Sequence, residues 1–317
     1  MSVTRFILGR LSRLVATLLV SSVVIFSALY VAPGNPIATL SGGRSLSKES
    51  VAILEKRFHL DQPFFVRYVN WLWGVLHGDL GISIKLRQEV SSLISARMST
   101  TLTLVLYASV IILVVGIGCG VWAALRPGVA DSSILVTTAV SAAIPAFVAT
   151  TLLLFIFVLR LGWFPAFGSG DGLADRLYHL TLPAVALAIS SLAVVARVTR
   201  AAVREELVRE HVQTAISRGL PRSMIVRKHV LRNAAIPITT VSGVTMASLL
   251  ALSAVVERAF SVNGLGAYLV NAATTNDFAV VQGISLFIVA AFTVTNTVVD
   301  MLYAVLDPRI NLGTTAT

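Results

Sequence analysis

The chain has 317 residues, of which 56% are hydrophobic and 13% are charged, and its formal net charge is +10. Soluble domains carry about 25% charged residues, so this composition excludes a water-facing globule and favours one domain built in lipid. Cys119 is the single cysteine and lies in a long apolar run, which excludes an intrachain disulfide, and no Cys/His pattern has metal-ligand spacing.

Six stretches without Asp, Glu, Lys or Arg are long enough to cross a bilayer as helices, which takes about 20 residues. They are Leu14–Ala32, Met98–Leu125, Ser132–Leu159, Leu177–Ala196, Asn233–Val256 and Phe278–Val299. Backbone groups in lipid need internal hydrogen bonds, so each stretch is expected to be a helix. Barrel strands would be shorter and would alternate. The predicted fold class is an all-α integral membrane protein with six transmembrane helices.

A basic leader at residues 1–13, with Arg5, Arg10 and Arg13, precedes the first span at residues 14–32. A cleaved signal peptide and an uncleaved anchor are both compatible with such a leader. Signal peptides have apolar regions of about 7–15 residues, and the run here is longer. The pattern favours an uncleaved anchor.

Residues 33–97 form a long segment of mixed charge that is expected to lie outside the cell. Apolar and aromatic residues recur in it at helical spacing, which predicts short amphipathic helices against the outer face. They include Leu54, Phe58, Leu60, Phe64, Phe65, Tyr68, Trp71, Leu72 and Trp73. Anchoring in the membrane interface is one interpretation, and contact with an external solute-receptor protein is the other.

A seventh uncharged stretch, Ala259–Asn276, contains too many Asn, Thr and Gly residues for a lipid-facing span. It is interpreted as an outer loop with a short, re-entrant helix. Glu257, just before it, and Asp300 border the spans, so the spans are expected to lack the buried charges that mark ion relays.

The basic residues predict the topology by the positive-inside rule. Both termini are expected in the cytoplasm, together with residues 126–131, the loop 197–232 and the tail 307–317. The loop 197–232 carries nine basic residues: Arg197, Arg200, Arg204, Arg209, Arg218, Arg222, Arg227, Lys228 and Arg232. This location accounts for much of the net charge without invoking nucleic acid.

Catalytic signatures are missing from the sequence. It has no G-x-x-x-x-G-K-[ST] phosphate loop, no HExxH and no GxSxG, and its five histidines are scattered. The chain is therefore not expected to be an enzyme, and energy for active transport would have to come from a partner.

The loop 197–232 is much longer than the usual connection of about 2–8 residues between packed helices. Good helix formers predict one helix over Val203–Arg218, which Gly219 ends with a left-handed cap. After Pro221 a second helix is expected over Ser223–Ala235, leading to Pro237 and the fifth span. Such a rigid projection can transmit force from a cytoplasmic partner.

At this loop the sequence resembles the importer permeases of the ATP-binding-cassette superfamily, whose loop reads E-A-A-x3-G. Gln213-Thr214-Ala215 and Gly219 occupy the motif positions, with Gln and Thr in place of Glu and Ala. The dipeptide/oligopeptide branch fits better: its "YVRTARAKGL…RHALRNALIP" is matched by "HVQTAISRGL…KHVLRNAAIP".

Further stretches agree in order along nearly the whole chain, which indicates a B-type subunit. They are Leu60-Asp61-Gln62-Pro63, Gly78-Asp79-Leu80-Gly81, Glu257-x-x-Phe260-Ser261-x-x-Gly264-x-Gly266, Val280-Val281-Gln282-Gly283 and Asp307-Pro308-Arg309.

The resemblance implies that residues 98–306 form a permease core and that the loop around Gly219 couples it to an ATPase. The implied coupling residues are Gln213, Thr214, Ala215, Arg218, Gly219, Leu220 and Pro221. The small Ala215 and Gly219 would fit into a groove, and Arg218 with Arg222 either pairs with acidic residues of the ATPase or is ordinary positive-inside charge.

The implied partners are a second, usually different, permease subunit, two ATP-binding subunits and an extracytoplasmic solute-binding protein, in a bacterial inner membrane. ATP and Mg²⁺ would bind to the ATPase subunits, with no cofactor on this chain and no nucleic-acid partner. The branch carries dipeptides, longer peptides, nickel and a few sugars or haem-like ligands, and peptide is favoured. An ion-coupled carrier predicts charge inside the spans, and a non-transport scaffold leaves the loop unexplained.

Overall fold

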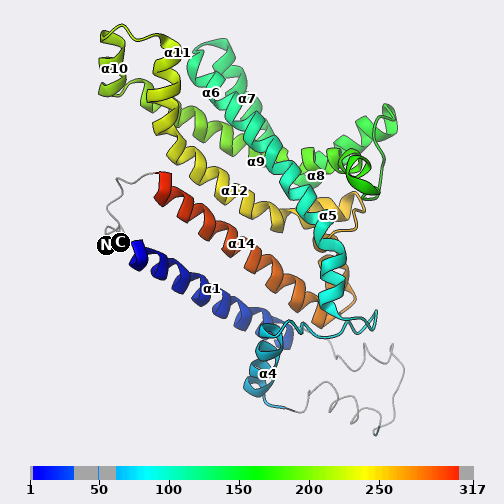
Figure 1. Cartoon of the computed structure of the whole chain (residues 1–317). Helices are drawn as coiled ribbons and strands as arrows, with labels where there is room; N and C mark the ends of the chain where they lie inside the picture. The colour runs from blue at the N-terminus through cyan, green and yellow to red at the C-terminus, as the bar shows by residue number, and fades with distance from the viewer. Residues whose placement is uncertain (1–2, 32–48, 50–61, 307–317) are drawn as a thin grey trace.

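The computed structural model describes residues 3–31, 49 and 62–306, and throughout these residues the regular elements are helices (Figure 1). The α-helices are α1 (Val3–Val31), α4 (Phe64–Leu76), α5 (Val90–Ile111), α6 (Ile117–Leu125), α7 (Val129–Ala143), α8 (Ala146–Leu153), α9 (Gly172–Leu207), α10 (Glu210–Ser217), α11 (Arg222–Met224), α12 (Leu231–Ala259), α13 (Leu265–Thr274) and α14 (Phe278–Leu306). Three π-helical segments occur: η1 (Ile112–Gly116) and η3 (Ile225–Val230) join neighbouring helices, and η2 (Leu154–Arg160) extends α8.

Five helical rods of the described chain are long and apolar enough to cross a membrane. They are α1, the rod α5–η1–α6, α9, the rod α11–η3–α12, and α14. The remaining predicted span, Ser132–Leu159, is a bent pair of helices, Asp131–Ala143 and Ala146–Arg160, with an angle of 101° between its halves. The predicted all-α membrane fold is confirmed, and the spans number six when the bent pair is counted as one.

The prediction of one unbroken helix over Ser132–Leu159 is wrong. The helix breaks where Ile144 adopts an extended conformation, with φ −79° and ψ 117°, before Pro145. Proline lacks the N–H that a continuing helix needs, and its ring disfavours the helical conformation of the residue before it. The sequence contained this signal, but an apolar window does not register it.

Helix α9 is the central element, because it packs against α5, α6, α7, α8 and α12. Glycines of the α5–α6 rod allow the closest approach. A Cβ atom on Gly120 would lie 2.6 Å from the carbonyl oxygen of Ala196, and one on Gly116 would lie 3.3 Å from that of Leu192. Small residues spaced four apart bring helix backbones together in this way inside membranes. Helix α1 lies at the side of the bundle, against α14 and α4 (Figure 1).

We call the end of the bundle that carries α10 the α10 end, and the opposite end, which carries α13, the α13 end. At the α10 end Arg10 of α1 bonds to Asp300 of α14, so the first helix starts where the last one finishes. Several helices extend beyond the uncharged windows. The fourth span, predicted over Leu177–Ala196, is the 36-residue α9, since charged residues continue a helix once it leaves the lipid.

Predictions for residues 32–48, 50–61 and 307–317 lie outside the described residues. These include the first half of the outer segment, with Leu54 and Phe58, and the closing Asp307-Pro308-Arg309 motif. Helix α4 is the described amphipathic helix of the outer segment, and α13 is the short helix predicted inside 259–276.

Candidate functional site

The predicted projection exists at the α10 end, but it is built differently from the prediction. A single helix over Val203–Arg218 was expected. Instead α9 ends at Leu207, and Arg209 is extended, with φ −64° and ψ 147°, before α10 begins. No glycine or proline marks this corner in the sequence. The turn lets α10 fold back beneath the bundle and bury one of its faces.

Two residues of α10 form that buried face. Val212 is fully buried and Ala215 is 4% exposed, and both pack with Val203 of α9 and with Ile225 and Val230 of η3. Ala215 was predicted to help fill a partner's groove. The structure places it inward, where its small side chain lets α10 lie close to the spans.

Helix α10 ends in a Schellman motif, in which a left-handed residue reverses the chain after the last turn. Gly219 has φ +69°; its N–H donates to the Ile216 carbonyl (2.9 Å), and the Leu220 N–H donates to the Ala215 carbonyl (3.3 Å). Leu220 also packs against the cluster beneath α10, as such motifs require. The predicted glycine stop is confirmed, and Pro221 then precedes α11.

The remaining predicted residues lie on the outer side of this projection. We call the exposed residues Val208, Gln213, Thr214, Ile216, Arg218, Gly219 and Pro221 the α10 surface. Val208 is 74% exposed and Ile216 is 52% exposed. The fold therefore presents two apolar side chains on the same surface as the predicted polar and basic residues.

Hydrogen bonds fix the projection to the spans. The side-chain amide of Asn233, at the start of α12, donates to Nε2 of His211 in α10 (3.1 Å) and to the His229 carbonyl (3.0 Å). Ala234 beside it is buried in the same cluster as Ala215. Asn233 and Ala234 of the LRNAAIP stretch therefore attach the projection to the start of α12.

An ion cluster ties the bent span to α9 at the same end. Both oxygens of Asp131, near the start of α7, accept hydrogen bonds from Arg200, and Arg204 donates to Oδ2 at 2.7 Å. In the sequence these arginines indicated only the topology. Their i, i+4 spacing on α9 was the available signal, but the distant carboxylate was not predictable.

At the α13 end a buried carboxylate holds the short helix α13 in place. Glu257 of α12 is fully buried; its Oε1 accepts from the Thr101 hydroxyl (2.8 Å) and its Oε2 from the Ala267 N–H (2.9 Å). Thr101 accepts in turn from the Leu265 N–H (2.8 Å). These bonds satisfy free N–H groups at the start of α13. Glu257 lies in the last turn of α12, at the border of the span as predicted, but its complete burial was not predicted.

The glycines of the Glu257 motif make this packing possible. A Cβ atom on Gly264 would lie 2.4 Å from Cδ of Glu257, and one on Gly266 would lie 2.4 Å from Cα of Ala254. Helix α13 therefore crosses α12 at a distance that no other residue permits.

Burial raises the pKa of Tyr268 in α13, and the Arg97 guanidinium lies 4.1 Å from the centre of its ring.

A second carboxylate pins the outer segment to the same end. Asp277, between α13 and α14, is 3% exposed and accepts from the Ser83 hydroxyl (2.5 Å) and the Ile84 N–H (3.2 Å). The segment after the Gly78-Asp79-Leu80-Gly81 motif is thereby fixed over the corner that joins α13 to α14.

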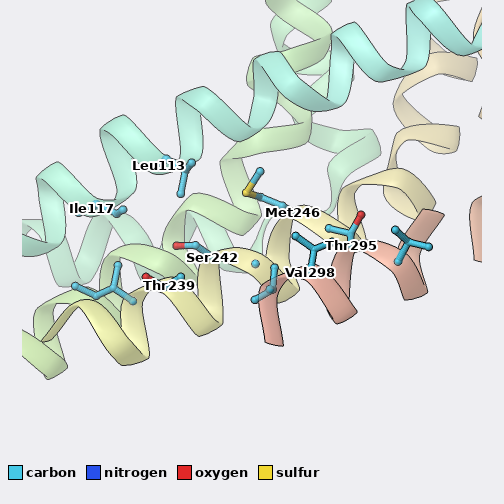
Figure 2. A pocket seen from close by; sticks show the side chains of 11 residues that line it. Leu113, Ile117, Thr239, Ser242, Met246, Thr295 and Val298 are labelled. Atoms are coloured by element: carbon cyan, nitrogen blue, oxygen red, sulfur yellow. The ribbon is translucent and has the colours of Figure 1, made fainter. Parts of the chain in front are cut away.

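A cavity of about 410 Å³ lies between the α5–α6 rod, α12 and α14 (Figure 2). Its walls carry no charged residue, and they consist of Leu113, Ile117, Ile238, Thr239, Ser242, Gly243, Met246, Val294, Thr295, Val298 and Val299. In Figure 2, Leu113 and Ile117 face Ser242 and Met246 from the opposite wall. The Ser242 hydroxyl is buried without a hydrogen-bond partner among the described residues. Sequence reasoning had assigned no residue to such a space.

Comparisons with known proteins agree with this architecture. Residues 116–312 match the family of binding-protein-dependent transport system inner membrane components, and residues 3–105 match its N-terminal region. The chain belongs to this family, and so it is a multi-pass membrane subunit of a transporter.

Among its relatives is the dipeptide transport system permease protein DppB of Escherichia coli (strain K12). The two are 33% identical over an alignment of 337 positions that covers 96% of this chain and 98% of DppB. A Brucella abortus protein whose name describes a peptide transport system permease is 36% identical and covers 97% of this chain and 99% of its own length. The membrane fold is also similar to a chain of the inward-facing MetNI methionine transporter, with a TM-score of 0.52, 19% identity and coverage of 68% and 96% of the two chains.

Proposed function

We propose that this chain forms half of the membrane pathway of an ATP-driven importer of dipeptides or oligopeptides. The peptide class is supported by the names of full-length relatives at 33–36% identity. ATP and Mg²⁺ bind to two separate ATPase subunits, a second permease subunit completes the pathway, and an external binding protein delivers the peptide. This chain binds no cofactor of its own.

The observation that carries the coupling role is the seating of α10. Val212 and Ala215 hold it against α9, η3 and α12, while Gln213, Arg218 and Gly219 remain exposed. A push on the α10 surface therefore moves the ends of two spans together, α9 and the α11–η3–α12 rod. In this proposal ATPase closure acts on that surface and turns the pathway between inward and outward opening.

The surface has a chemistry that its partner must match. Ile216 and Val208 supply exposed apolar side chains, and Arg218 and Arg222 supply positive charge on both sides of Gly219. The partner surface is expected to be an apolar groove with acidic residues at its rim. The basic loop also supports the topology in which the α10 end and both termini face the cytoplasm.

The cavity is assigned to the pathway wall. Its lining is uncharged and presents hydroxyl and thioether groups from α12, which suits peptides whose side chains differ. Recognition of the particular peptide then lies mainly with the external binding protein.

A pair of matched glycines tests the coupling role. Gly219 (φ +69°) and Gly162 (φ +62°), which follows η2, both have a left-handed φ and no atom within 4 Å of the Cβ position. Gly219→Arg should abolish co-purification of the ATPase and ATP-dependent uptake of a radiolabelled dipeptide in proteoliposomes, while Gly162→Arg should retain both. Full co-purification and uptake by Gly219→Arg would contradict the docking role. Uptake of nickel or another solute instead of peptide would leave the docking role and overturn the substrate class.

A further inference from the structure

Helix α4 presents two apolar faces, and the chain itself covers one of them. On the covered face Phe64, Tyr68 and Trp71 surround Phe26 of α1, with ring centroids 5.4–5.6 Å from that of Phe26. The Tyr68 hydroxyl also lies 2.9 Å from the Ser22 hydroxyl. This aromatic cluster fixes the rotation of α4 about its own axis.

The other face has no partner among the described residues. Phe65, Val69 and Trp73 recur every four residues and, with Val66 and Leu76, form a stripe without charge, which we call the α4 stripe. Phe65 is 77% exposed, Leu76 72% and Trp73 66%. Since the aromatic cluster holds the opposite face, the helix cannot turn the α4 stripe inward.

The position of α4 restricts what can cover this stripe. The helix is attached near the end of α1 that lies away from α10 (Figure 1), and with 13 residues it is too short to cross a bilayer. Beside the contact with α4, Val23 and Val24 of α1 are exposed on a helix long and apolar enough to span the membrane. The α4 stripe therefore continues an apolar surface that already belongs to a spanning helix.

Its composition matches a lipid boundary better than water. Aromatic residues such as Trp and Phe favour the membrane interface, and a helix that lies in that interface combines an apolar stripe with a polar edge. Here the edge is formed by Asn70 and His77, which are exposed beside the stripe. Arg67, the one charged residue of α4, is half-buried and is not part of the α4 stripe.

We propose that α4 is an interfacial helix whose stripe enters the lipid leaflet at the α13 end, at the boundary between head groups and acyl chains. It anchors the outer segment to the membrane surface beside α1. The Asp277 contact with Ser83 and Ile84 fixes the following segment to the bundle, so the segment from α4 to α5 is held both by lipid and by protein. This role is independent of the transported solute.

Spin labels on the full chain in lipid nanodiscs test the proposal. In a Cys119→Ser background, single labels are placed at Val69→Cys and Trp73→Cys in the stripe, at Asn70→Cys on the polar edge, and at Val20→Cys on the exposed side of α1. Collisions with O2, which dissolves in lipid, and with a water-soluble nickel chelate are measured at each site. The ratio of O2 to nickel collisions should be several-fold higher at Val69→Cys and Trp73→Cys than at Asn70→Cys, and should approach the ratio at Val20→Cys.

Two results would overturn the proposal. A ratio in the stripe equal to that at Asn70→Cys would place the stripe in water, and low collision rates with both reagents would place it under protein. Size-exclusion chromatography of each labelled variant before reconstitution identifies a chain that fails to fold, and the Val20→Cys variant supplies the ratio expected at a lipid-exposed site.

Discussion

The two ends of the bundle use their motif residues in opposite directions. At the α10 end most of the residues singled out by sequence lie on the surface, and Gly219 has no atom within 4 Å of its Cβ position. At the α13 end the motif residues point inward, and Gly264 and Gly266 are packed against Glu257 and Ala254. Glycine serves conformation at one end and close approach at the other.

The difference separates a surface that is available to a partner from a packed joint, the α13 joint, that holds the chain's own helices together. Substitutions on the α10 surface should lower the unfolding free energy little, because its side chains make few internal contacts. The α13 joint contains a buried carboxylate, a hydroxyl and two backbone N–H groups, all of which need partners inside the protein. Substitutions at the two ends should therefore fail in different ways.

The largest loss of stability is expected from Gly266→Ala. Its new Cβ would meet the backbone of Ala254 at 2.4 Å, and overpacking against backbone costs about 3 kcal/mol. The midpoint of thermal unfolding in detergent, followed by size-exclusion chromatography of the heated protein, measures the effect.

Gly118→Ala is the matched control. Gly118 lies in helix α6 with no atom near its Cβ position, so alanine there should stabilise by about 0.5–1 kcal/mol through helix propensity. Equal unfolding midpoints for Gly266→Ala and Gly118→Ala would show that α13 does not approach α12 as described.

A smaller loss is expected from Glu257→Ala. The substitution leaves the Ala267 N–H without an acceptor, while the Thr101 hydroxyl can rotate, and one orphaned buried donor costs about 2 kcal/mol. The same unfolding midpoint measures it. Glu257→Gln keeps one acceptor oxygen and should lie between Glu257→Ala and the native chain; a midpoint below that of Glu257→Ala would contradict the hydrogen-bond assignment.

The sequence predicted features that depend on residues close together in the chain, and it missed features that depend on residues far apart in the chain. The Gly219 cap depends on residues 215–220 alone, and its position was predicted correctly. The burial of Glu257 depends on Thr101, which is 156 residues away, so a window of hydropathy placed Glu257 at a border. The break at Pro145 was legible locally and was overlooked because the surrounding residues are uniformly apolar.

The corner at Val208 and Arg209 had no such signal. Both residues tolerate a helix, and the break arises because Val212 and Ala215 gain more contact by packing beneath the bundle than α9 would gain by continuing. The same packing moves Ala215 from the predicted surface to the interior and exposes Ile216. A local pattern gives the helix and its end, but the side that faces inward is set by the tertiary structure.

A moderate loss is expected from Asp131→Asn, which tests whether the α10 end has a joint of its own. Arg200 and Arg204 would lose a charged acceptor that is 7% exposed, so the unfolding midpoint should fall, and partial exposure of the arginines keeps this fall smaller than that of Glu257→Ala. Glu205→Gln breaks an exposed pair with Arg209 and should change the unfolding midpoint by less than half as much. Equal effects of the two substitutions would make the Asp131 cluster an ordinary surface pair.

The smallest effect on stability, and the sharpest contrast between the ends, is expected from Gly219→Asn. Asparagine tolerates left-handed backbone, and the space around Gly219 is open, so the unfolding free energy should fall by about 0.5 kcal/mol or less. The new side chain nevertheless stands on the α10 surface, where a docked ATPase would have to accommodate it. Peptide uptake should therefore drop several-fold in a chain that is as stable as the native one, whereas Gly162→Asn, at a left-handed glycine after η2 with equally open space, should leave uptake unchanged. If both variants transport normally, the left-handed glycine is a helix cap and nothing more, and the α10 end would not differ in kind from the α13 end.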